Sequence, residues 1–382
     1  MDQEYTPLDL STLDLSTPLP TYPADFRSGF ASLVGRPNAG KSTLTNAMVG
    51  QKVAITSQTT RHTIRGIVHK DEYQLILVDT PGIHRPRTLL GERLNDLVAS
   101  TLSQVDVLGF CIPANEKIGP GDRYIASQLV ASSNKPVVAI VTKADTVSSE
   151  ELREQLLAVE ALGEEVMSAE RAARAKRAAH RAKQKGKGPK GKDGKNDAVP
   201  FAKGSGPAAK RRAGEVAEPM PVDGKGGWAA IIPVSAVKHF QVDAVADLLA
   251  QYTPLSPPLY PEGELTDEPE ATLIAELVRE AALEGAREEL PHSIAVTVEE
   301  MEFREGRPAD NPLLDVHVNL FVERESQKYI IIGKGGSNLR KIGTKAREQI
   351  EAMLGTRIYL NIHVKVAKEW QSDARALNRL GF

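Results

Sequence analysis

Apolar runs and amphipathic stretches alternate along residues 30–163. The apolar runs fall at 30–34, 63–69, 73–79, 105–113 and 136–142, and stretches with helical spacing fall at 42–49, 90–102, 121–131 and 149–163. Short apolar strands that alternate with helices are typical of a mostly parallel sheet covered on both faces. Ligands of such sheets bind at the carboxyl ends of the strands. The pattern therefore predicts an α/β fold whose functional residues follow its strands.

This alternation breaks between about Glu164 and Gly227. Residues 164–174 are rich in Ala, Glu and Arg, which favours a prolongation of the preceding helix. From Lys185 onward Gly, Lys and Pro dominate, so that we expect disorder there. A strand at 228–234 and a helix at 242–252 then complete the sheet. We thus predict one domain over 27–252 with a basic insertion at about 164–227.

A second domain is predicted over residues 266–382. Prolines stiffen the linker at 253–265 that precedes it. The pattern then predicts an α+β unit with helices at 266–289, 337–354 and 372–380 and strands at 293–303, 313–323 and 356–366. Residues 1–26 are acidic and rich in Pro, Thr and Ser, without the basic start and apolar centre of a secretion signal. We interpret them as a disordered leader.

Composition narrows the class of protein. The 382 residues suggest two or three domains, and no run of about 18 apolar residues predicts a membrane span. The single cysteine, Cys111, excludes an internal disulfide and a cysteine-based metal cluster. It lies in an apolar run, and we expect a buried strand residue in a reducing cytoplasm.

The net charge of −2 hides a strong asymmetry. The segment from Arg171 to Arg212 contains 15 Lys or Arg and two Asp, which leaves 33 Lys or Arg and 48 Asp or Glu for the rest of the chain. A basic segment in an acidic protein indicates an anionic partner.

Residues 35–42 fit the phosphate-loop pattern G-x-x-x-x-G-K-[ST] without a mismatch: Gly35, Arg36, Pro37, Asn38, Ala39, Gly40, Lys41 and Ser42. The glycines let the backbone wrap around phosphates, so that a row of N–H groups faces the anion. The Lys41 ammonium can reach the outer phosphates, and the Ser42 hydroxyl can hold Mg²⁺. A strand precedes the loop and a helix follows it, so its N-terminus would face the phosphates. We predict a nucleoside phosphate site here, rather than a Gly-rich turn that fits by chance.

Three later segments also follow strands, and they bear on which nucleotide is bound. Asp79-Thr80-Pro81-Gly82 brings a carboxylate that can hold Mg²⁺ through water and a glycine N–H for a terminal phosphate, although it is also an ordinary strand-to-turn signal. In Thr142-Lys143-Ala144-Asp145 the carboxylate can accept two hydrogen bonds from guanine, a donor pair that adenine lacks. Ser235-Ala236 can offer a backbone N–H to guanine O6. Four motifs in this order predict a guanine nucleotide site.

The set resembles GTPases of the translation-factor class and is most similar to the Era family. Further similar segments are Gln58-Thr59-Thr60-Arg61-His62, Ile83-His84-Arg85-Pro86, Leu90-Gly91-Glu92 and residues 115–122, and the resemblance covers about Phe26 to Trp370 without the insertion. It implies GTP or GDP and Mg²⁺ as ligands. It places two switch loops at residues 53–63 and 82–90. Thr60 is then the Mg²⁺ ligand of the first switch loop, and Lys41, Thr60 and Gly82 contact the transition state or the switches.

The chain departs from the family pattern at three places. Thr142 replaces the usual Asn of the base-reading motif, and the segment before Gln58 is shorter by roughly three residues, a loop length change that is tolerated. Ile83 stands where Ras-type enzymes have the Gln that orients water, so no catalytic base is assigned. His62 and His84 are more typical of solvated loop residues than of proton carriers. In related GTPases an Asn at the position of Asn38 coordinates K⁺; the alternative is a plain loop residue.

The second domain carries its own motif. Gly333-Lys334-Gly335-Gly336 follows three isoleucines and leads into a helix with Arg340, Lys341 and Lys345. Two glycines let a nucleic-acid backbone approach closely, and Lys334 can meet a phosphate. This is the Gly-x-x-Gly loop of a KH domain, and the order helix–strand–strand–helix–helix–strand fits the type II variant of Era proteins. We expect His363 and Trp370 to be packing residues rather than base readers.

The leading hypothesis is a GTP-hydrolysing switch that binds RNA. By resemblance the RNA is the 3′ end of small-subunit (16S) ribosomal RNA, and the role is maturation of the 30S subunit; DNA is not expected. Three alternatives stay open: an RNA-binding chaperone with structural nucleotide, a small-molecule kinase or ATPase, and a tRNA-modification GTPase, although the C-terminal cysteine of that class is absent. The basic insertion is either a solvated tether or a second RNA contact through counterion release. Its charge also leaves peripheral contact with the inner face of the membrane open.

Overall fold

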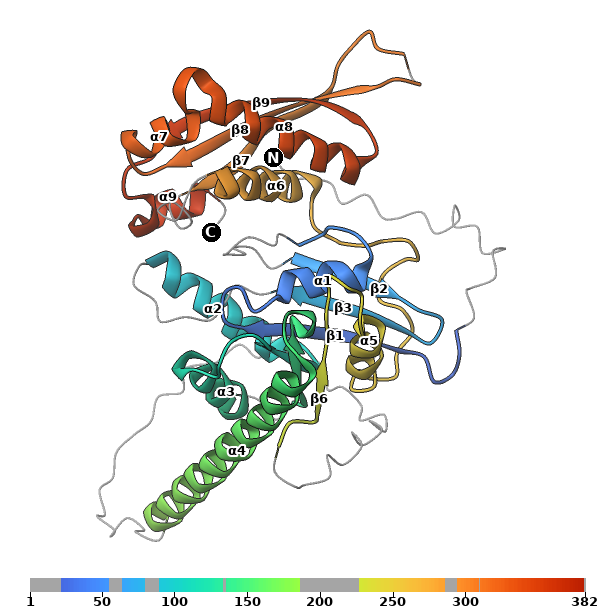
Figure 1. Ribbon diagram of the computed structural model, residues 1–382, viewed down its shortest axis with the longest axis vertical. Coiled ribbons are helices and arrows are strands. Elements are labelled where there is room, and N and C mark those ends of the chain that lie inside the picture. The colour runs from blue at the N-terminus through green and yellow to red at the C-terminus, as the bar shows by residue number, and fades with distance from the viewer. Residues whose placement is uncertain are drawn as a thin grey trace, which may run out of the picture.

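The N-terminal domain is built on a six-stranded sheet of order β2-β3-β1-β4-β5-β6 (Figure 1). The computed structural model describes residues 22–54, 64–79, 89–132, 135–185, 227–285, 294–308 and 310–380. All neighbours in this sheet are parallel except β2 and β3. The mostly parallel sheet predicted from the sequence is thus confirmed. The strands are β1 (Arg27–Gly35), β2 (Ile64–His69), β3 (Tyr73–Asp79), β4 (Val107–Pro113), β5 (Val137–Thr142) and β6 (Ala230–Pro233).

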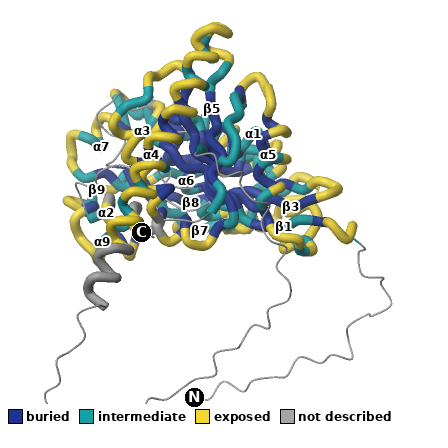
Figure 2. The backbone as a smooth tube through the Cα atoms, turned by 90° about the horizontal axis from the view of Figure 1, so that it is seen from below, coloured by how far each residue is buried: buried dark blue, intermediate teal, exposed yellow. Residues whose placement is uncertain are grey.

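Helices cover both faces of this sheet. One face packs against α2 (Leu89–Gln104), α3 (Pro120–Ser132) and α4 (Ser149–Lys185), and the other against α1 (Lys41–Val49) and α5 (Val242–Ala250). Strands β3, β4 and β5 are buried along their whole length, which explains their continuous apolar runs. Cys111 in β4 is fully buried, as expected. Figure 2 shows the buried residues gathered in the strands and the exposed ones on the outer helices.

Helix α4 (Ser149–Lys185) runs 37 residues, so that it includes the prolongation favoured at 164–174 and continues beyond it. Ala, Glu, Arg and Lys fill the added part, and these are strong helix formers. Gly163 lies inside the helix and does not end it. A glycine is needed there because a Cβ would lie 2.8 Å from the indole nitrogen of Trp228. The Trp228 indole N–H also donates to the carbonyl oxygen of Val159, at 2.7 Å. The disorder expected after Lys185 falls on residues outside the described ranges, as does the leader as far as residue 21.

The predicted linker lies along the edge of the first domain. The carboxamide oxygen of Gln74 accepts hydrogen bonds from the backbone N–H groups of Leu259 and Tyr260, at 2.7 and 3.0 Å. The N–H of Ile67 in the edge strand β2 donates to the carbonyl oxygen of Leu265 at 2.9 Å. These contacts hold the segment against β2 and β3.

The second domain has a three-stranded sheet of order β7-β8-β9, with β8 and β9 parallel. Its elements follow the predicted order: α6 (Glu270–Gly285), β7 (Ala295–Phe303), β8 (Leu313–Val322), α7 (Glu325–Ile332), α8 (Ser337–Leu354) and β9 (Arg357–Val366). Helices α6 and α8 pack on one face of the sheet. Trp370 is fully buried, as expected, but His363 is exposed on β9, because its position in the period-two alternation faces away from the helices. The expectation of a packing role for His363 was wrong.

The two domains touch next to the two segments that the Era resemblance identifies as switch loops. Leu90 in α2 packs with Ala295, Trp370, Leu377 and Leu380, the last three from the C-terminal turn and helix α9 (Ala374–Arg379). Lys52 forms an ion pair with the buried carboxylate of Glu280 in α6. Lys52 directly precedes the first of these segments, residues 53–63, and Leu90 is the last residue of the second, residues 82–90, so the second domain contacts one end of each.

Candidate functional site

The phosphate loop joins β1 to α1, as predicted. Gly40 and Asn38 adopt positive φ angles, 84° and 63°. The Lys41 ammonium donates to the carbonyl oxygens of Gly35 and Arg36 at 3.3 and 3.0 Å, so that the loop closes around this side chain. Burial lowers the pKa of Lys41, and the nearby charge of Asp79 opposes that shift. A cation is thus held under the turn that the sequence assigns to phosphates.

Two oxygen groups meet beside the loop. The Ser42 hydroxyl donates to the buried carboxylate of Asp79 at 2.8 Å, although the residues lie 37 positions apart. Both were predicted as magnesium ligands. Asp79 ends β3, directly next to β1, and this register brings the two side chains together. Thr60 and the segment Thr80, Pro81, Gly82 and Ile83 lie outside the described residues, and their roles stay predictions.

A cavity of about 230 Å³ adjoins the phosphate loop. Its walls bring together Gly40 of the phosphate loop and residues of both predicted base-reading segments: Thr142, Lys143, Asp145 and Ala236. Asp145 is exposed in the short turn after β5, and Lys143 before it has a φ angle of 56°. Ser235 next to Ala236 is buried, and its hydroxyl accepts the N–H of Lys238 at 3.1 Å. Thr43, Leu44, Thr146, Val234 and Val237 also line the cavity, and no motif pointed to them.

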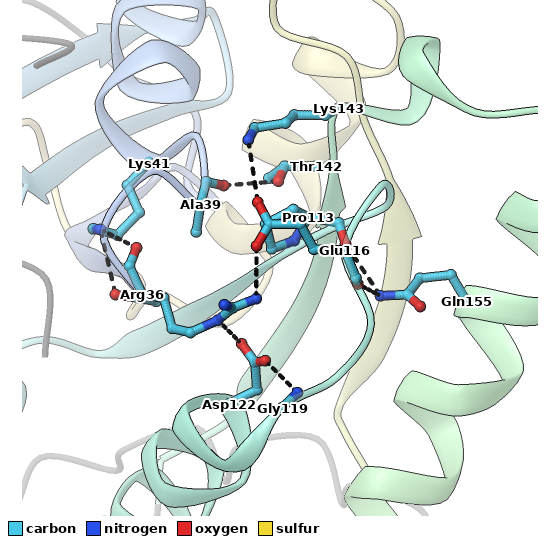
Figure 3. Close-up of polar contacts among 11 residues, drawn as sticks. Arg36, Ala39, Lys41, Pro113, Glu116, Gly119, Asp122, Thr142, Lys143 and Gln155 are labelled. Atoms are coloured by element: carbon cyan, nitrogen blue, oxygen red, sulfur yellow. Dashed lines mark hydrogen bonds and ion pairs between the residues drawn. The ribbon is translucent and has the colours of Figure 1, made fainter. Parts of the chain in front are cut away.

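Thr142 contacts the phosphate loop directly. Its hydroxyl donates to the carbonyl oxygen of Ala39 at 2.7 Å, and its side chain is buried (Figure 3). Thr142, in place of the usual Asn, therefore connects the base-reading motif to the phosphate loop through a hydrogen bond.

A charged network surrounds Arg36 on the outer side of the loop (Figure 3). The guanidinium donates to the carboxylate of Asp122, at 2.7 Å, and this carboxylate is fully buried and also accepts the N–H of Gly119. Glu116 lies 3.1 Å from Arg36 and 3.8 Å from the Lys143 ammonium. Sequence reasoning assigned no role to Asp122 or Glu116, although the segment containing them was part of the family resemblance. Their partners are distant in sequence, and no spacing rule would have found them.

The second domain has a groove of about 430 Å³ between α8 and β9. Gly336 of the Gly-x-x-Gly loop and Arg340 line it, together with Arg347 and Tyr359, which sequence reasoning missed. Gly333, Gly335 and Gly336 all have positive φ angles, and a Cβ at Gly333 would lie 2.7 Å from Asn338. Lys334 in this loop and Lys341 in α8 are both exposed, and neither lines the groove. The guanidinium of Arg304 lies 5.2 Å from the centre of the Tyr359 ring.

The comparisons with known proteins agree with this arrangement. Residues 30–143 match the family described as 50S ribosome-binding GTPase, and residues 289–371 match the KH domain family. The chain is 55% identical over 359 residues to GTPase Era of Streptomyces coelicolor, covering 93% of this chain and 95% of that protein. The chain belongs to the GTPase Era family. GTPase Era of Mycobacterium avium is 53% identical, with coverage of 94% and 99%.

Solved structures of Era have the same fold along nearly the whole chain. A variant of Aquifex aeolicus Era bound to GDP and AlF₄⁻ has a TM-score of 0.71 at 29% identity, covering 93% of this chain and 99% of that one. Era in complex with MgGDPNP and nucleotides 1506–1542 of 16S ribosomal RNA has the same TM-score and coverage at 30% identity. None of the helices in the described ranges combines bilayer-spanning length with sufficient hydropathy.

Proposed function

We propose that the protein is a GTP-hydrolysing switch of the cytoplasm that binds the 3′ end of 16S ribosomal RNA and assists maturation of the 30S subunit. The observation that carries this proposal is the cavity beside the phosphate loop, which Asp145, Lys143 and Ala236 line. The Asp145 carboxylate can accept the two guanine donors, and it lines the same cavity as Gly40 of the phosphate loop, which supports the proposal. The KH groove on the same chain supplies the RNA site.

Different described residues would bind different parts of the nucleotide. The backbone of residues 35–42 and the Lys41 ammonium bind the phosphates, and the Asp145 carboxylate selects guanine. Ser42 and Asp79 would hold Mg²⁺, because their paired oxygens are donors that this ion prefers and because it takes its remaining ligands from phosphates and water. When bound, the ion offsets charge on the phosphate oxygens.

Hydrolysis needs a water molecule in line with the terminal phosphate, and the chain offers no Gln at position 83 to orient it. Within the phosphate loop, Asn38 is the remaining candidate for a role in hydrolysis, as a ligand for a K⁺ ion that would offset charge between the phosphates. Its left-handed backbone conformation gives a second reason for an Asn at this position, since Asn tolerates that region. Turnover in KCl against NaCl separates the two, and equal rates would leave only the backbone reason.

Coupling between the sites follows from the contacts between the domains. Lys52 precedes the first switch loop and pairs with Glu280, whereas Leu90 ends the second and packs on Trp370. Nucleotide-dependent ordering of these loops would shift both contacts and thereby the position of the KH groove. GTP hydrolysis would in this way release or rearrange the bound RNA.

Calorimetric titration with GDP and with ADP tests the nucleotide half of the proposal. We expect GDP to bind at least about 100-fold more tightly, because adenine lacks the two donors that the Asp145 carboxylate can accept and leaves this group unpaired in the complex. Asp145→Asn should remove most of this preference, since the amide offers only one acceptor, whereas Glu150→Gln nearby should leave it intact. Equal affinities for GDP and ADP in the unsubstituted protein would favour an ATPase or kinase.

A gel shift with an oligonucleotide of the 16S 3′ end tests the RNA half. We expect the full-length protein to retard this oligonucleotide and not a DNA of the same sequence at equal concentration, because the 2′-hydroxyl distinguishes the two at an RNA site. Failure to retard the RNA would contradict the assignment of the groove.

A further inference from the structure

The C-terminal part of α4 projects from the first domain (Figure 1). Residues 171–185, here called the arm, continue the helix without a break to Lys185. The residues of α4 that pack into the core end at Val166 and Met167. Arg174, near the start of the arm, donates a hydrogen bond of 3.3 Å to the carbonyl oxygen of Val130. At about 1.5 Å per residue, the helix beyond Arg174 reaches about 16 Å further.

The arm is basic throughout. It contains seven Lys or Arg and no Asp or Glu, within a protein whose remaining sequence is acidic. The nearest acidic residue of the helix is Glu170, which pairs with Arg174 at 2.9 Å and with Arg177 at 3.7 Å. Positive charges near a helix C-terminus interact favourably with the helix dipole, which explains one or two of them. It does not explain seven.

The spacing concentrates this charge on one side. Positions 174, 177, 181 and 185 follow one another at three or four residues, which places them on one face of a helix. Like charges at this spacing destabilise a helix by a few tenths of a kcal/mol per pair. A stripe of this kind is therefore costly for a solvated helix and becomes favourable when an anionic partner neutralises it.

The residue types indicate which anion it is. The arm consists of Arg, Lys, Ala, His and Gln and has no aromatic residue and no aliphatic side chain larger than Ala. Helices that lie on a membrane bury a face with Leu, Phe or Trp, and the arm has none to bury. A polyphosphate backbone needs only the cations.

We propose that the arm is a second RNA contact, which binds the phosphate backbone of folded RNA through the stripe at 174, 177, 181 and 185. It lies at the opposite end of the molecule from the KH domain (Figure 1). A short single strand in the KH groove does not reach it, whereas a large folded RNA can occupy both sites and gains affinity from their linkage. The inference rests on the proposed function only in taking RNA as the partner.

The test compares two variants of the full-length protein with equal net charge. Arg177→Gln with Arg181→Gln removes two cations of the stripe, and Lys176→Gln with Lys183→Gln removes two from the other side of the same helix. Gln is a good helix former, and circular dichroism checks that both variants keep the helicity of the unsubstituted protein. The readout is the dependence of log K on log[KCl] for binding to full-length 16S ribosomal RNA transcript.

We expect the stripe variant to flatten this slope by about 1.5, since each lost phosphate contact removes about 0.7–0.9. The opposite-face variant should change it by less than half as much. Both variants should bind the short oligonucleotide of the 16S 3′ end as the unsubstituted protein does. Equal slopes for all three proteins, or equal losses in the two variants, would overturn the proposal in favour of a solvated tether or an unspecific charge effect.

Binding to vesicles of phosphatidylglycerol and phosphatidylcholine tests the membrane alternative. Loss of vesicle binding in the stripe variant, with unchanged binding to the transcript, would overturn the proposal in favour of a membrane contact. A failure of the proposed function itself is distinguishable, because the short oligonucleotide would then not bind to any of the three proteins.

Discussion

Thr142 and Ala39 connect the base-reading motif to the phosphate loop through one hydrogen bond, from the threonine hydroxyl to the alanine carbonyl oxygen, at 2.7 Å. Both residues are buried. The end of β5 is therefore linked directly to the turn that follows β1. An Asn is usual at this position in related GTPases, and the shorter threonine side chain still reaches the carbonyl oxygen here.

Thr142→Val should weaken nucleotide binding. Valine has nearly the shape of threonine but leaves the buried Ala39 carbonyl without this donor, at a cost of about 1–2 kcal/mol. If the lost hydrogen bond destabilises the binding-competent conformation of the phosphate loop by this amount, GDP affinity falls about 5- to 30-fold. Calorimetry measures the effect. Thr142→Ser keeps the hydroxyl and is the control; equal GDP affinity in the valine and serine variants would contradict the role of the hydrogen bond.

Asp122→Asn should destabilise the first domain. The carboxylate of Asp122 is fully buried and accepts hydrogen bonds from Arg36 and from the N–H of Gly119. An amide is uncharged and has only one acceptor oxygen, so it cannot replace both interactions. We expect the free energy of unfolding to fall by about 1–3 kcal/mol, visible as a drop of several degrees in Tm. Glu116→Gln, at the half-exposed partner of the same Arg36, should cost less than about 1 kcal/mol. Similar losses in both variants would show that burial does not distinguish the two pairs.

Gly335→Asp should abolish binding to the 16S oligonucleotide without unfolding the KH domain. A Cβ at Gly335 meets no atom within 4 Å, and its φ of 60° is in the left-handed region that Asp and Asn tolerate. The added carboxylate would repel the RNA phosphate. Gly335→Asn has the same shape without the charge and should retain most of the affinity in a gel shift. Equal losses would mean that the side chain, and not its charge, blocks the loop.

The thiol of Cys111 should be unreactive in the folded protein. Burial raises its pKa from 9.0 to about 12, so that the folded state retains the proton where the unfolded chain releases it. The stabilisation that this provides is present below about pH 9 and is lost as the pH rises from there toward 12. Iodoacetamide at about pH 8.5, near the ordinary pKa of a thiol, should alkylate the protein only after denaturant is added. Mass spectrometry that detects rapid alkylation of the native protein would contradict the burial.

The sequence predicts those parts of this molecule that depend on local pattern. The apolar runs mark β1, β3, β4 and β5, because both faces of these strands are buried, and the glycines of residues 35–42 and 333–336 mark turns whose φ angles few other residues adopt. Helix α4 includes the prolongation favoured at 164–174 and continues to Lys185, and nothing in its composition marks where packing stops and the projecting arm begins.

The contacts that depend on three-dimensional register were not predictable from the sequence. Asp122 reads as a first-turn acidic residue of α3, and only the fold shows that it receives Arg36 from a loop 86 residues earlier. Likewise, the pairing of Lys52 with Glu280 spans 228 residues and depends on how the domains dock. His363 illustrates the reverse error, since a histidine in an apolar run was expected to pack and instead lies on the exposed side of β9.

The rate of GTP hydrolysis with and without the 16S 3′-end oligonucleotide tests the central claim most directly. If the two sites form one switch, saturating RNA changes the steady-state rate of the unsubstituted protein, and Gly335→Asp, measured at the same RNA concentration, stays at the rate without RNA. An identical rate in the presence and absence of bound RNA would contradict the coupling and would favour an RNA-binding chaperone in which the nucleotide is structural.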